Sequence, residues 1–87
     1  MILVTFDDQT MADRRMAAAG LVFRLSKGQV RLAKLLMGGL DLAEAALQMG
    51  VSVNTVRTQL RRIFDKTGVH NQAALVRVLL SIAPPLG

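Results

Sequence analysis

The 87-residue sequence contains no cysteine and a single histidine, His70. Without cysteine the chain can form no disulfide, no thiolate metal site of the zinc-finger kind and no thiol nucleophile. The sequence spacing suggests no carboxylate or hydroxyl partner for His70. The sequence also lacks a glycine-rich dinucleotide loop, a P-loop and a nucleophile elbow. We therefore expect no enzymatic activity, no catalytic residue, no metal site and no cofactor.

Long hydrophobic runs are absent as well. The longest apolar stretch covers residues 16–23 and is interrupted by Gly20, whereas a membrane-spanning helix needs about 20 apolar residues. Asp7 and Asp8 follow the short apolar start, which is unlike a signal peptide. These features predict a soluble, cytoplasmic chain without membrane contact. Its 52% of hydrophobic residues can form the core of one small domain.

Acidic residues are scarce in most of the chain, so its net charge of +5 is unevenly distributed. Residues 24–87 contain nine Lys or Arg and three Asp or Glu, a net charge of +6. Residues 1–23 have a net charge of −1. A basic surface of this kind attracts polyanions such as nucleic acid. Charge alone leaves equally open a solvated basic surface that serves solubility.

Residues 24–83 contain four predicted helices, each preceded by a capping side chain and followed by glycine or proline. They cover residues 27–37, 42–49, 53–67 and 72–82, and the capping residues are Ser26, Asp41, Ser52 and Asn71. Glu44 completes a capping box with Asp41. Apolar residues recur at helical spacing in each segment. We expect an all-α domain over residues 24–83, followed by a short tail, residues 84–87.

The N-terminal segment, residues 1–23, has a different pattern from the four predicted helices. The β-branched run at residues 2–6 ends at Asp7 and Asp8, which predicts a short strand without a partner in this chain. A helix is expected over about residues 11–19, ending near Gly20. The following apolar residues, 21–23, should then dock on the core. This segment is interpreted as a connector.

A tight turn joins the second and third predicted helices of the domain. Gly50 suits the left-handed residue that ends a helix, and only Val51 separates it from the next N-cap, Ser52. So short a turn forces the two helices to cross steeply, as in a helix-turn-helix, whose second helix enters the major groove of DNA. Steep helix pairs also occur in purely structural bundles.

The helix over residues 53–67 has a polar face opposite its apolar stripe. We expect this face to contact DNA bases through Asn54, Arg57, Thr58 and Arg61. Arginine suits guanine edges because its guanidinium donates two hydrogen bonds at once. Residues at the helix N-terminus and other basic residues are candidates for phosphate contacts. These candidates are Ser52, Thr55, Arg62, Lys66 and Lys27.

The spacing of these features resembles the LuxR/FixJ-type, GerE-like C-terminal helix-turn-helix domain of bacterial transcription regulators. The resemblance covers residues 24–80, about two-thirds of the chain. The matching stretches are residues 25–26, 35–36, 39–40, 50–52, 55–58 and 61–73. It implies a four-helix DNA-binding domain that acts as a dimer. The family's base- and phosphate-facing positions fall on Arg57, Thr58 and Arg61, with Thr55 at the phosphates.

The chain departs from the family pattern at two places. Gly28 and Gln29 replace a frequent Arg-Glu pair, and Gln59 replaces a frequent histidine. In many relatives a sensor domain, often PAS-like, precedes this domain, and residues 2–6 resemble the last strand of such a sensor. The chain then corresponds to the C-terminal part of a longer regulator. A stand-alone small regulator is the alternative.

The last predicted helix is apolar on more than one face. We expect Leu75, Val78 and Ile82 to form a dimer interface, with the N-terminal strand as a second contact. The alternative is that the N-terminal segment covers these residues. The expected partners are double-stranded DNA, a second copy of the chain and RNA polymerase. A protein-interaction module without DNA binding is the second functional hypothesis.

Overall fold

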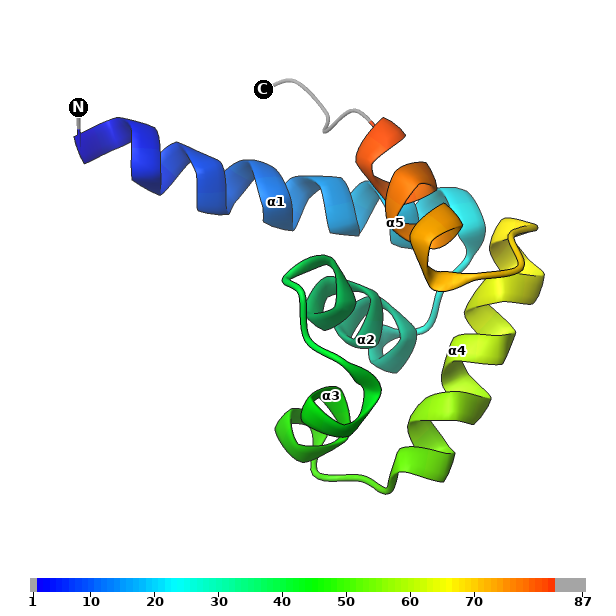
Figure 1. Cartoon of the computed structure of the whole chain (residues 1–87). Coiled ribbons are helices and arrows are strands. Elements are labelled where there is room, and N and C mark those ends of the chain that lie inside the picture. The colour runs from blue at the N-terminus through cyan, green and yellow to red at the C-terminus, as the bar shows by residue number, and fades with distance from the viewer. Residues whose placement is uncertain (1, 83–87) are drawn as a thin grey trace.

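The computed structural model describes the backbone of residues 2–82 and the side chains of residues 13–82. The predicted tail lies outside these residues. Five helices make up the described chain: α1 (Ile2–Phe23), α2 (Lys27–Met37), α3 (Leu42–Met49), α4 (Val53–Thr67) and α5 (Gln72–Ser81). α2 and α3 lie under α1, α4 runs down one edge, and α5 lies beside the C-terminal half of α1 (Figure 1). None of the described helices is long and apolar enough to cross a membrane.

One hydrophobic core joins all five helices. Each helix contributes at least two fully or nearly fully buried apolar side chains, so no helix is an independent appendage. The buried set is Met16, Ala19, Leu32, Ala33, Leu36, Ala45, Ala46, Val56, Leu60, Ile63, Leu75 and Leu79. The all-helical fold class is confirmed.

The predicted starts of α2 to α5 are confirmed, together with their caps. Ser26, Asp41, Ser52 and Asn71 each accept a hydrogen bond from the backbone N–H three residues on, at 2.8–3.2 Å. Such a bond satisfies one of the free N–H groups at a helix start. Helix α5 ends at Ser81, one residue before the predicted end. Local capping chemistry therefore sets these boundaries.

The strand predicted over residues 2–6 is wrong. These residues form the first turns of α1, which continues without a break to Phe23. An isolated strand would leave its backbone N–H and C=O groups unpaired, whereas a helix satisfies them within the segment. The interpretation of residues 2–6 as the last strand of an upstream sensor loses its structural support.

The sequence predicted that the helix ends near Gly20, but Gly20 lies inside α1 and faces Val30 of α2. The helix ends three residues later, and Leu25 N–H donates to the Gly20 carbonyl at 2.9 Å. Arg24 takes a left-handed φ of 58° at this end. Leu21 and Val22 are 83% and 62% exposed, so their predicted docking on the core is also wrong. Only Phe23 of this trio packs against the core.

The three residues predicted for a dimer interface lie in α5 or at its C-cap, and the position of α5 relative to α1 determines their exposure. Leu75 is fully buried in the core, and Ile82 packs against it. Arg15 of α1 donates through Nε to the Ile82 carbonyl at 3.1 Å, which ties α1 to the end of α5. Asp13 of α1 also forms an ion pair with Lys34 of α2. Helix α1 thus packs on α5, and the Leu75 side chain has no exposed surface in the single chain.

Candidate nucleic-acid interface

The turn between α3 and α4 depends on a left-handed residue. Gly50 has φ 68° and ψ 34°, which a residue with a Cβ adopts at a cost. The Val51 N–H donates a hydrogen bond to the Ala46 carbonyl at 3.1 Å, which caps the C-terminal end of α3. Arg31 of α2 donates to the neighbouring Gln48 carbonyl at 2.9 Å. This contact places a cation at the negative end of α3, where the helix dipole favours it.

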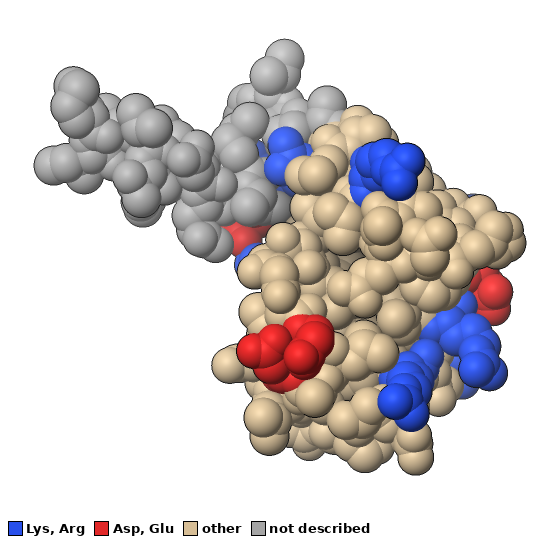
Figure 2. All heavy atoms as spheres, viewed as in Figure 1, with Lys and Arg blue, Asp and Glu red and all other residues tan. Residues whose placement is uncertain are grey.

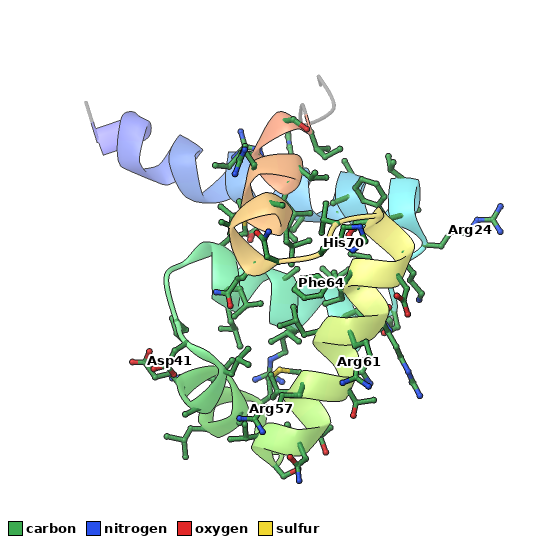
Figure 3. All side chains as sticks on the ribbon, turned by 45° about the vertical axis from the view of Figure 1, so that its right-hand side comes forward. Arg24, Asp41, Arg57, Arg61, Phe64 and His70 are labelled. Carbon is green, nitrogen blue, oxygen red and sulfur yellow. The ribbon has the colours of Figure 1, made fainter. Side chains whose placement is uncertain are left out.

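Helix α4 has one buried and one exposed face. Val56, Leu60 and Ile63 are buried against the other helices, and Phe64 points toward the core from the same side (Figure 3). This burial fixes the rotation of α4 about its axis. Of the residues between them in sequence, Arg57, Thr58, Arg61 and Arg62 are exposed and Gln59 is half-buried.

The four predicted base-facing residues, Asn54, Arg57, Thr58 and Arg61, are all exposed on α4. Figure 3 shows Arg57 and Arg61 projecting from α4, on the lower part of the molecule. Neither guanidinium has a hydrogen-bond or ion-pair partner among the described residues. The Thr58 hydroxyl donates to the Asn54 carbonyl at 3.0 Å, which fixes its rotamer and leaves its methyl group free to make contacts.

Two of the predicted phosphate residues form a hydroxyl pair at the start of α4. Ser52 Oγ accepts from the Thr55 N–H at 3.1 Å and lies 3.0 Å from Thr55 Oγ1. Both residues are exposed. The remaining free N–H groups of the first turn and the positive end of the helix dipole favour an anion here. An N-cap and an anion contact are compatible at this position.

The other three phosphate candidates differ in their contacts. Lys27 and Arg62 are exposed and have no side-chain partner among the described residues. Lys66 is also exposed at the residue level, but its ammonium group is held in place. Its Nζ donates to the Arg24 carbonyl at 2.9 Å and to Gln29 Oε1 at 2.7 Å. Lys66 therefore joins α4 to the start of α2.

Sequence reasoning missed Gln29 as a site residue. It is buried, and its Nε2 donates to Gln59 Oε1 at 3.0 Å. Both residues are departures from the family pattern, and this shared departure was the signal that could have connected them. His70 lies in the loop before α5 (Figure 3), and the described residues contain no group of three or more possible metal ligands.

Charge is distributed unevenly over the described surface. Figure 2 shows basic side chains over α4, and an acidic pair on the opposite side, over the start of α3. The acidic pair is Asp41 and Glu44, whose carboxylates accept backbone N–H groups in the capping box of α3. These two acids are thus engaged in capping, away from the basic side chains over α4, beside which Figure 2 shows one further acidic region at the edge of the view.

A family model described as bacterial regulatory proteins, luxR family, matches residues 24–79. The chain belongs to this family. The match spans α2, α3, α4 and most of α5, which makes the α3–α4 pair the helix-turn-helix of a DNA-binding regulatory domain. It confirms the resemblance inferred from the sequence. Searches of curated proteins and of solved structures gave no significant match.

Proposed function

We propose that the chain binds double-stranded DNA in a sequence-specific manner, with α4 as the recognition helix in the major groove. The observation that carries the proposal is the pair of exposed arginines on α4, Arg57 and Arg61, which lie opposite its buried face and have no partner within the described part of the chain. Two like charges four residues apart cost an isolated helix a few tenths of a kcal/mol. A surface with only a structural role gains no stability from two neighbouring arginines. On DNA, a phosphate would compensate their charge and a guanine edge would accept their hydrogen bonds.

Each residue of the exposed face has a chemical role in this proposal. Arg57 and Arg61 donate in pairs to guanine O6 and N7, and Asn54 pairs with adenine. Thr58 presents its methyl group to thymine, since its hydroxyl is already bonded within the helix. Ser52 and Thr55 meet a phosphate at the helix start, and Lys27, Arg62 and Lys66 supply further positive charge. Residues 24–83 form the DNA-binding unit, and α1 extends it on the N-terminal side.

A salt titration of DNA binding tests the proposal. Fluorescence anisotropy with a mixed-sequence duplex should give salt-sensitive binding, with a slope of log K against log salt of about −4 to −5 if four to six phosphates are contacted. The double variant Arg57→Ala, Arg61→Ala should lose sequence-selective binding. Arg77→Ala, which removes one exposed charge from α5, is the control. Tight selective binding by the double variant would refute the role of α4.

A second candidate is a role in association between proteins, including a homodimer. It is favoured by one observation, the exposure of Leu80 on α5 at 54%. Val78 is half-buried, but two residues apart on a helix it lies on nearly the opposite side from Leu80, so Leu80 is the exposed apolar residue that supports this candidate. Sedimentation velocity at micromolar protein distinguishes the two candidates. Dimerisation without salt-sensitive DNA binding would favour the second.

A further inference from the structure

Gln29 is the one buried polar side chain among the described residues, with 4% of its surface exposed. Its Oε1 accepts the Ser26 N–H at 3.0 Å, and its Nε2 donates to Gln59 Oε1 at 3.0 Å. No buried side-chain nitrogen or oxygen of the described part of the chain lacks a partner. Gln29 therefore links the start of α2 to the middle of α4 through hydrogen bonds, and its buried amide has partners for both its oxygen and its nitrogen.

The same Oε1 atom holds Lys66. Its ammonium group donates to Gln29 at 2.7 Å and to the Arg24 carbonyl at 2.9 Å. Both acceptors are neutral, and the one ion pair of the described residues lies elsewhere, between Lys34 and Asp13. The Lys66 side chain is thus anchored at a fixed place while its positive charge stays uncompensated by an acid.

A carboxylate at position 29 would keep the two contacts in which Gln29 accepts, from the Ser26 N–H and from Lys66. It has no N–H to donate to Gln59, so the Gln59 amide would have to turn and donate instead. Glutamate has the shape of glutamine, and a charge-assisted bond to Lys66 would be stronger than the present one. It would also cancel most of the ammonium's field. The amide holds Lys66 more weakly and leaves its charge available to an external anion.

We propose that Gln29 is a positioning residue of the DNA-binding face, because its neutral amide fixes Lys66 between α4 and α2 without cancelling the charge. The inference rests on the proposed function and deepens it. Lys66 lies one helical turn after Arg62 on α4. A fixed ammonium at this place adds to the field that attracts DNA phosphates, and it loses less conformational entropy on binding than a free lysine.

The isosteric variant Gln29→Glu tests the charge. At about 50 mM salt its affinity for a mixed-sequence duplex should fall about 3- to 10-fold below wild type, and the difference should shrink at higher salt. Ser81→Glu, which changes the net charge equally at the end of α5, is the matched control and should stay within about twofold of wild type. Equal affinities of the two variants, with wild-type binding intact, would overturn the role of Gln29. A wild type that does not bind the duplex would overturn the proposed function itself.

Thermal unfolding tests the contacts without DNA. Gln29→Glu keeps partners for its oxygens and should unfold at the wild-type temperature or above. Gln29→Met preserves the approximate size of the side chain, removes its hydrogen bonds and should unfold several degrees lower. If Gln29→Glu unfolds below Gln29→Met, Lys66 does not neutralise the residue at position 29, and the inference fails.

Discussion

A Cβ atom placed on Gly20 of α1 would lie 2.9 Å from Cγ2 of Val30 on α2. Carbon atoms at van der Waals contact are about 3.5–4.0 Å apart, so the backbone of α1 approaches α2 as closely as a glycine allows. The contact lies in the same part of α1 as the buried residues Met16 and Ala19. It explains why a glycine stands inside a long helix, where it lowers helix propensity.

Two glycine substitutions should therefore have opposite effects on stability. Gly28→Ala in α2 meets no atom within 4 Å and should raise the free energy of unfolding by about 0.5–1 kcal/mol through helix propensity. Gly20→Ala gains the same propensity but must displace the stiff Val30 side chain, and it should cost about 1 kcal/mol net. Urea unfolding followed by circular dichroism measures both. A stabilising Gly20→Ala would show that α1 does not pack on α2 in this way.

Replacing the two exposed arginines of α4 by lysine should separate charge from geometry. Arg57→Lys and Arg61→Lys keep the charge but lose the two-pronged donor. We expect each variant to lose about 1–3 kcal/mol of preference for a duplex selected from a random pool, with little change in the salt slope on mixed DNA. Anisotropy on both duplexes gives the comparison. If the lysine variants keep the wild-type preference for the selected duplex, Arg57 and Arg61 do not recognise the bases.

Ser52→Asp should separate capping from phosphate binding. Aspartate is as good an N-cap as serine, so the unfolding temperature should stay within about 2 °C of wild type. Its negative charge would repel a phosphate at the start of α4, and DNA affinity should fall about tenfold or more at low salt. Asn71→Asp makes the equivalent change at the start of α5 and serves as the control. Equal DNA affinity of the two variants would argue against a phosphate at Ser52.

Leu75 and Leu80 of α5 should respond differently to truncation. Leu75→Ala opens a cavity in the core and should cost about 2–5 kcal/mol of unfolding free energy. Leu80→Ala removes an exposed side chain and should change stability by less than about 0.5 kcal/mol. If the exposed edge of α5 mediates dimerisation, Leu80→Ala also weakens association in sedimentation velocity. A wild-type dimer that Leu80→Ala leaves intact would place the interface elsewhere.

Most helix boundaries of the helix-turn-helix domain could be predicted from the sequence, because the patterns that set them extend over only a few residues. Each cap acts over three residues, and the apolar stripe of α4 needs only one turn of helix to repeat. For that reason the starts of α2 to α5 and the exposure of Arg57 and Arg61 agree with the prediction. In the N-terminal segment the local pattern was misleading. Its β-branched residues favoured a strand, but the sequence offered no second strand to pair with it.

Local sequence signals were enough to predict the helix starts, the polar face of α4, the left-handed turn at Gly50 and the concentration of positive charge after residue 24. Which apolar side chains are buried depended on the packing of the helices, because burial arises from contacts between segments distant in sequence. That packing buried Leu75, left Leu21 exposed, and brought Gln29 and Gln59 within 3.0 Å across 30 residues of chain. It also anchored Lys66 on neutral acceptors, a relationship that no sequence spacing encodes.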